Sequence, residues 1–144
     1  MVAARIRPES NLSAVFFANG EGFLQSAGLR DGSDDRHSCY ATAIATELVL
    51  KAFLLSQGWS DKRCRRDIRH DLGKALAFAQ AEGLKTAPNG LGDVIGVLNA
   101  YYPRHAFDGF VAPDGDTTFA ARARGDVADL FDVVRPHVKV ADDA

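Results

Sequence analysis

The sequence predicts an all-α protein, an up-and-down bundle of four to five helices in a single domain. Apolar residues recur at helical spacing along most of the chain, and no segment has the strict alternation that is typical of a strand. The length of 144 residues suits one domain with a hydrophobic core, and the composition, 47% hydrophobic and 25% charged, is that of an ordinary globular protein. We therefore expect one helical domain over residues 1–144, with 1–9 and 138–144 as loose ends.

The central helix is predicted around Ala43–Leu55, which is its middle part, and it runs to Gln57 with Gly58 as its stop. Its apolar residues cover almost the whole circumference, which is typical of the buried centre of a bundle. Glu47 and Lys51 interrupt them, four residues apart in the order that favours an ion pair. Two interpretations are open. The pair is either exposed and contributes about 0.3–0.5 kcal/mol, or it is partly buried in a groove between helices, where losing one partner would cost far more.

The remaining helices are predicted from their caps and breaks. A first helix begins near Ser10 or Asn11, and it is bent or split where Asn19, Gly20 and Gly22 interrupt its apolar face. The central helix starts at Asp34, Asp35 or Ser38. The third helix starts at Asp71 and stops at Gly83, and the fourth starts at Asn89 and stops at Pro103. The last helix starts at about Asp126 and is broken by Pro136.

Two connecting segments are harder to assign. Residues 104–125 have no helical period, but Phe107, Phe110 and Phe119 predict that this segment packs onto the bundle. Residues 59–69 are polar and strongly basic, and we favour a solvated loop and first helical turn there. The alternative is a patch for a phosphate backbone, and so for RNA or a nucleotide, or for an acidic partner. Its cations are Lys62, Arg63, Arg65, Arg66 and Arg69.

Several classes of site are not expected. The two cysteines fit neither a disulfide framework nor a metal site, and we expect Cys39 in the core and Cys64 exposed. There is no Gly-rich phosphate loop and no zinc or nucleophile motif, so we predict no metal and no cofactor. The N-terminus lacks the apolar run of a signal peptide, and no apolar run is long enough for a membrane span, which predicts a cytoplasmic protein without membrane contact.

Three motifs carry a resemblance to a known family. A helix with Glu47, Lys51 and Ala52 in Glu-x-x-x-Lys-Ala spacing is followed by His70-Asp71-Leu72 at the start of another helix. Residues 98–104, Leu-Asn-Ala-Tyr-Tyr-Pro-Arg, then end a later helix with a Tyr and an Arg. The order and spacing of these motifs, over residues 39–104, resemble the HEPN domain, a small all-helical module of prokaryotes and eukaryotes.

The resemblance implies a function as a binding or partner module. It implies a homodimer with a groove between subunits, in a toxin–antitoxin or defence system or beside a nucleotidyltransferase-like partner protein. The residues that match the motifs, and that would line the groove, are Glu47, Lys51, His70, Asp71 and Arg104. From the residues alone, a simpler interpretation is that His70 pairs with a carboxylate, for which Glu47 is the candidate. Asp71 would then be a helix cap.

An enzymatic alternative is a metal-independent ribonuclease. The ribonucleases of the HEPN family use an Arg followed four to six residues later by a His, where the Arg holds a phosphate and the His acts as general acid or base. Arg65 and His70 have this spacing, which makes them the candidate catalytic pair. They lie before the third helix, however, and in those enzymes the pair usually lies late in the bundle. We therefore prefer the binding module.

Overall fold

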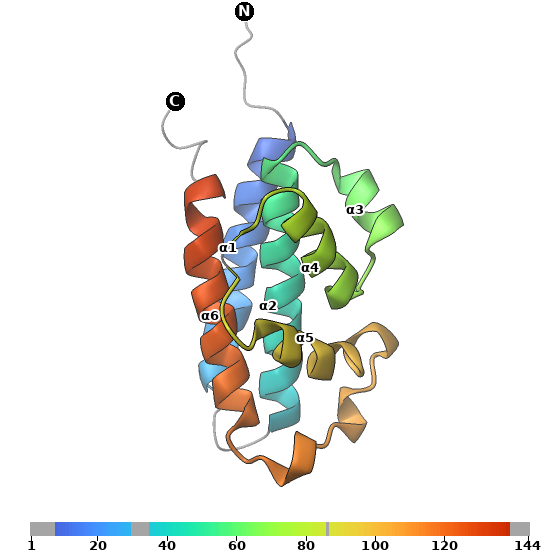
Figure 1. The fold of residues 1–144 in the computed structure, drawn as a ribbon, viewed down its shortest axis with the longest axis vertical. Helices are drawn as coiled ribbons and strands as arrows, with labels where there is room; N and C mark the ends of the chain where they lie inside the picture. The colour runs from blue at the N-terminus through green and yellow to red at the C-terminus, as the bar shows by residue number, and fades with distance from the viewer. Residues whose placement is uncertain (1–7, 30–34, 86, 139–144) are drawn as a thin grey trace, which may run out of the picture.

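The structure, a computed structural model, describes residues 8–29, 35–85 and 87–138. Within these ranges the chain forms α-helices and short 3-10 turns and no strand, which confirms the all-α bundle. Three long helices make up its main body: α1 (Pro8–Leu29), α2 (Asp35–Ser56) and α6 (Phe119–Val138) (Figure 1). The chain runs along α1 in the direction opposite to α2, whereas α6 runs in the same direction as α2, so the bundle does not alternate strictly up and down.

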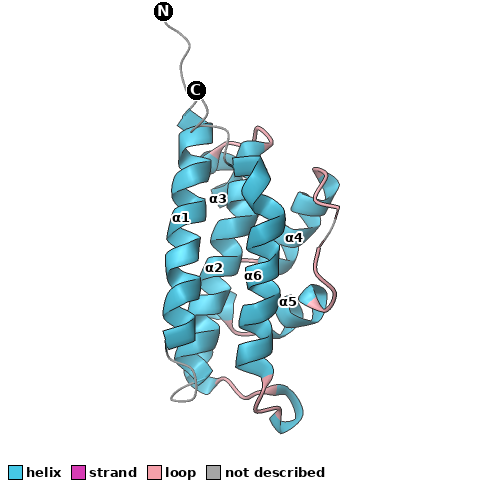
Figure 2. Ribbon diagram, turned by 90° about the vertical axis from the view of Figure 1, so that its left-hand side faces the viewer, coloured by secondary structure: helices cyan, strands magenta, loops and turns pink. Residues whose placement is uncertain are grey.

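The helix α2 is the core of the fold, as predicted. Fifteen of its 22 residues are buried, so it is enclosed on nearly all sides. Figure 2 shows α1 on one side of it and the shorter helices α4 and α5 on the other. The helix ends as expected at Gly58, which has a φ of 104°. The amides of Gly58 and Trp59 donate to the carbonyls of Leu55 and Leu54, and this geometry is that of a Schellman cap.

The first helix is continuous, so the predicted bend or split is wrong. α1 also begins at Pro8, before the predicted Ser10 or Asn11. Gly20 is tolerated because α6 crosses close to it: a Cβ there would lie 2.9 Å from the ring of Phe131. Ser13, which is buried, donates a hydrogen bond to the carbonyl of Ala52 at 2.6 Å and ties α1 to α2.

The basic stretch forms a helix of its own, α3 (Asp61–Asp67), which is the element missing from the predicted four to five helices. The hydroxyl of Ser60 caps it by accepting from the amide of Arg63. The prediction that Cys64 is exposed is wrong, because one face of α3 packs on the core and buries that thiol completely. The guanidinium of Arg63 lies 3.6 Å above the ring of Trp59, so part of the positive charge covers an aromatic side chain.

The next two helices largely follow the prediction. α4 (Leu72–Ala81) is capped by Asp71 and followed by Gly83 with a φ of 111°. α5 (Leu91–Asn99) is preceded by Gly90 in the left-handed conformation, and so the predicted cap Asn89 lies one residue too early. Asp34, one of the three caps proposed for α2, lies outside the described residues.

The segment between α5 and α6 contains three 3-10 turns, η1 (Tyr102–Arg104), η2 (Phe107–Gly109) and η3 (Pro113–Gly115). Phe107, Phe110 and Phe119 are buried, which confirms that the segment packs onto the bundle. The last helix begins well before the predicted Asp126, because the carboxylate of Asp116 accepts from the amide and hydroxyl of Thr118 just before α6. It also continues past Pro136 to Val138.

Candidate functional site

A buried ionic network lies in the middle of the apolar helix α2. The side chains of Glu47 and Lys51 are only 11% and 6% exposed, and the ammonium of Lys51 lies 2.7 Å from Oε2 of Glu47. The structure therefore decides between the two interpretations of this pair in favour of burial. The network comprises Glu47, Lys51, His70 and Tyr102, and we call it the Glu47 network.

The second carboxylate oxygen of Glu47 joins two further elements to α2. Its Oε1 accepts from the hydroxyl of Tyr102 at 2.6 Å and lies 2.9 Å from Nδ1 of His70. These two residues come from η1 and from the turn before α4, which are 55 and 23 positions away along the chain. One carboxylate thus holds three elements together, and the predicted pairing of His70 with Glu47 is confirmed.

The pKa values of the network follow from these contacts. Burial alone would raise the pKa of Glu47, but the hydrogen bonds from Lys51, Tyr102 and His70 outweigh it, and the net pKa is lowered. Burial, and then the hydrogen bond to Glu47, raise the pKa of Tyr102 far above its usual value. Glu47 is therefore an ionised acceptor and Tyr102 a neutral donor near neutral pH.

An ionised Glu47 also defines which nitrogen of His70 carries a proton. A carboxylate without a proton can only accept, so Nδ1 of His70 must be the donor. Its other nitrogen, Nε2, has no hydrogen-bond partner among the described residues. Because the side chain is 53% exposed, the network holds an imidazole whose Nε2 is free to accept from, or donate to, a ligand.

Lys51 also supports the turn that presents His70. Its ammonium donates to the carbonyl of Arg69 at 2.6 Å. Arg69 has a φ of 57°, a left-handed conformation that costs free energy for a residue with a side chain. A second residue with positive φ, His105 at 53°, lies across from it, and its ring centroid is 6.0 Å from that of His70. Two of the three non-glycine residues with positive φ in the described chain therefore lie beside this site.

A small hollow adjoins the network on the side of η1 and η2. Tyr40, His105, Phe107 and Asp108 line it. Tyr40 is partly exposed and its ring lies 6.1 Å from that of Tyr102, which connects the hollow to the network. Sequence reasoning missed both Tyr102 as a partner of Glu47 and the proximity of His105.

Two residues predicted for the groove lie beside the network without joining it. Asp71 caps α4, where its Oδ1 accepts from the amide of Lys74 and from the side chain of Asn99, both at 3.0 Å. Burial would raise the pKa of Asp71, but these hydrogen bonds lower it overall. Arg104 is exposed in η1, next to His105.

The predicted catalytic arginine is engaged elsewhere. Arg65 lies on α3 with a side chain that is 72% exposed, and its guanidinium pairs with Asp61 at 3.3 Å. Arg63, seven residues before His70, pairs with Asp67 and covers Trp59. Neither guanidinium has a contact with His70 in the described structure.

Most cations of the basic stretch are exposed, on α3 and on the turn that ends at His70. Lys62, Arg65, Arg66 and Arg69 are exposed, and Arg66 also pairs with Asp67 at 2.8 Å. In the part of the chain that the structure describes, no group of three or more His, Cys, Asp or Glu side chains is placed to hold a metal ion. What the site offers is one oriented imidazole, a second one beside it, and positive charge around them.

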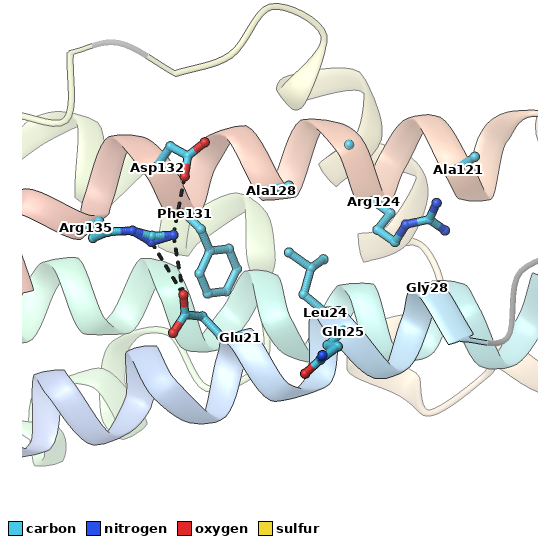
Figure 3. A pocket seen from close by; sticks show the side chains of 11 residues that line it. Glu21, Leu24, Gln25, Gly28, Ala121, Arg124, Ala128, Phe131, Asp132 and Arg135 are labelled. Atoms are coloured by element: carbon cyan, nitrogen blue, oxygen red, sulfur yellow. Dashed lines mark hydrogen bonds and ion pairs between the residues drawn. The ribbon is translucent and has the colours of Figure 1, made fainter.

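A separate groove lies between α1 and α6, away from the Glu47 network. Figure 3 shows its lining, with Glu21 of α1 reaching toward Arg135 of α6. Arg135 also contacts Asp132, and both of its ion pairs measure 3.3–3.4 Å. Glu21 and Asp132 both pair with Arg135, so we regard the groove as part of the α1–α6 packing.

No protein-family model, curated protein or solved structure matches the chain. By length and composition alone, α2 would be apolar enough to cross a membrane, but 83% of that apolar window is buried inside the structure. The core helix of a folded domain passes the same test, so this feature does not indicate a membrane span.

Proposed function

We propose that this chain is a HEPN-like binding module that works as a homodimer and binds its ligand at the surface around His70. The observation that carries the proposal is the double acceptance by Glu47 Oε1 of Tyr102 and His70. The three motifs of the resemblance contribute Glu47, His70 and Tyr102, and these three side chains are in direct contact.

The cost of the network supports a role in binding. Taking an ion pair out of water is expensive, and well-packed apolar side chains often do the same structural task as well or better. Here the charges orient one imidazole and brace the strained turn before it. That arrangement is useful where Nε2 of His70 must meet a ligand in a fixed direction.

The exposed cations favour a phosphate-bearing ligand, RNA or a nucleotide. Lys62, Arg65, Arg66 and Arg69 lie on α3 and the turn that ends at His70, while the whole chain has a formal net charge of −2. Contacts of this kind bind phosphates and weaken steeply as salt rises. The resemblance also implies a nucleotidyltransferase-like partner protein, and we propose that such a partner would bind to this same module.

The test is a titration of the purified protein with a short single-stranded oligoribonucleotide, in EDTA and at two salt concentrations. We expect saturable binding that weakens with salt and is reduced at least about 10-fold in His70→Ala, because a hydrogen bond to a charged group is worth about 1.5–3 kcal/mol. His137→Ala is the matched control, since His137 is an exposed histidine on α6. Equal binding by both variants would contradict the assignment of the site to His70.

A metal-independent ribonuclease is the second candidate, and the oriented His70 favours it. A histidine whose Nδ1 is held by a carboxylate has Nε2 placed to take or give a proton. Arg65 would have to leave Asp61 to reach a phosphate beside His70. RNA cleavage in EDTA that disappears in His70→Ala and falls in Arg65→Ala would establish this activity. Intact RNA with the wild-type protein would rule it out for that substrate.

A further inference from the structure

The hollow beside the Glu47 network contains polar groups that the described chain leaves free. Its volume is about 190 Å³, and Tyr40, His105, Phe107 and Asp108 line it. Among the described residues, nothing pairs with the hydroxyl of Tyr40, the ring nitrogens of His105 or the carboxylate of Asp108. By contrast, an ion pair crosses the groove between α1 and α6. A hollow in which free polar groups meet an aromatic surface is typical of a ligand site.

Aromatic rings form the fixed wall of this hollow. The ring of Tyr40, on α2, lies 5.7 Å from that of Phe107 and 6.1 Å from that of Tyr102. Phe107 is buried and packs in turn on Tyr101 and Phe110, so the wall is continuous with the core. Tyr40 is 39% exposed, which leaves part of its ring open to a ligand. Proteins that bind RNA hold unpaired bases on aromatic side chains of this kind.

The hollow lies next to the imidazole that the network orients. The ring centroid of His105 is 6.0 Å from that of His70. His105 has a φ of 53°, and strained positions of this kind cluster at ligand sites. The preceding residue, Arg104, is exposed, and its guanidinium has no partner among the described residues. A ligand whose phosphate meets His70 and Arg104 would therefore bring the group next to that phosphate to the hollow.

The polarity of Asp108 selects among the bases. An ionised carboxylate only accepts hydrogen bonds, whereas the hydroxyl of Tyr40 and the imidazole of His105 can donate or accept. The base must therefore present N–H groups to Asp108. Guanine is the one RNA base with two adjacent N–H donors on its base-pairing edge, and these match the two oxygens of a carboxylate. Adenine and cytosine place a ring-nitrogen acceptor beside their amino group, and uracil flanks its N–H with two carbonyls, so each turns a lone pair toward Asp108.

We propose that the hollow is a base subsite that prefers guanine, with Asp108 accepting from its base-pairing edge and Tyr40 packing on its ring. The inference rests on the binding of RNA or a nucleotide under the proposed function, and it adds which base lies beside the phosphate at His70. A volume of about 190 Å³ is below the range of about 300–1,000 Å³ that is usual for ligand pockets, so the hollow takes one base and leaves the sugar and phosphate outside.

The first test compares three single-stranded RNA heptamers in EDTA by fluorescence anisotropy: heptauridylate, and the same heptamer with a central guanosine or a central adenosine. We expect the guanosine heptamer to bind on the order of 10-fold more tightly than the other two, because a bidentate pair discriminates between bases by about this factor. Equal binding of all three, weakened by His70→Ala, would overturn the subsite and leave the proposed site at His70 standing. Equal gains from guanosine and adenosine would also overturn it, since stacking alone would explain them. No binding of any heptamer would overturn both proposals.

The source of the guanine is separated by titrating 5′-GMP and 5′-AMP alone in a calorimeter. A preference for 5′-GMP as strong as that in the heptamers would support a free nucleotide as the ligand. A preference seen only in the heptamers would support RNA.

The second test changes Asp108 alone. Asp108→Asn keeps the size of the side chain but replaces one acceptor oxygen by an amino group, which opposes the N–H donors of guanine. We expect the variant to bind the guanosine heptamer no more tightly than heptauridylate, and to bind heptauridylate as wild type does. Because the carboxylate has no partner in the described chain, the circular dichroism spectrum should be unchanged.

The matched control is Asp114→Asn. Asp114 is also an exposed aspartate that precedes a glycine in a 3-10 turn, η3, and it does not line the hollow. This variant should keep the full preference for guanosine. An undiminished preference in Asp108→Asn, or an equal loss in both variants, would overturn the assignment of the guanine subsite to Asp108.

Discussion

Replacing Lys51 by methionine removes the charge that balances Glu47 while keeping most of the side chain. The ammonium of Lys51 makes two contacts, with Glu47 Oε2 at 2.7 Å and with the carbonyl of Arg69 at 2.6 Å. Methionine fills the same space with apolar atoms and donates to neither. The carboxylate then stays buried with fewer donors, and the left-handed turn at Arg69 loses its support.

The expected loss of stability follows from the burial of the pair. Removing one partner of a buried ion pair costs roughly 3–5 kcal/mol. His70 and Tyr102 still donate to Glu47, so we place Lys51→Met at the low end, about 3 kcal/mol. Domains have unfolding free energies of about 5–15 kcal/mol, so the variant should remain folded. Urea denaturation followed by circular dichroism measures the loss.

A double-mutant cycle separates the pair from its neighbours. Lys51→Met combined with Glu47→Gln should be less destabilised than the sum of the single variants, with a coupling of at least about 1 kcal/mol. Lys74→Met is the control, because Lys74 is exposed on α4 and its loss should change stability by no more than about 0.5 kcal/mol. A Lys51→Met protein within about 1 kcal/mol of wild type would refute the reasoning, since the pair would then be solvated in solution.

Three further outcomes follow from the same structure. The net lowering of the Glu47 pKa gives stability that is present above the unfolded value and lost as the pH falls through the folded pKa. Below about pH 4.5, the unfolding free energy should therefore fall more steeply in wild type than in Glu47→Gln, as urea titrations at several pH values would measure. Tyr102→Phe should lose about 1–3 kcal/mol in the same denaturation assay, because Glu47 loses a donor; an unchanged midpoint would contradict the 2.6 Å contact. Burial raises the pKa of Cys39 to about 12 and that of Cys64 to about 11, so at about pH 8 both thiols should react with Ellman's reagent only after unfolding.

The sequence was sufficient to predict the core because α2 is apolar around almost its whole circumference. Ala45 and Leu54 lie on opposite sides of the helix, so a central position is needed to bury both, and both are buried. The two charged residues in its apolar part, Glu47 and Lys51, were visible for the same reason. Whether they were buried depended on which elements pack beside Glu47, and this is not encoded in the helix itself.

The structure of the basic stretch could not be predicted from its charge. Five cations and several acids suggested a solvated loop, although Trp59, Cys64 and Ile68 are apolar and become buried. A short helix stabilised mainly by tertiary packing has little signal of its own. The role of Tyr102 was missed because its partner is 55 residues away, although a buried tyrosine hydroxyl usually finds a hydrogen-bond partner.

The network also predicts how fold and binding can be separated. Glu47→Leu together with Lys51→Met replaces the buried charges by apolar side chains, a change that is often neutral or stabilising where packing is kept. If the charges serve mainly to orient His70, this double variant should keep wild-type helicity and unfold in one cooperative step. It should nevertheless bind the oligoribonucleotide as weakly as His70→Ala, because nothing then holds Nδ1 of His70. Wild-type binding by a folded double variant would mean that the imidazole needs no orientation, and the network would be a device of folding alone.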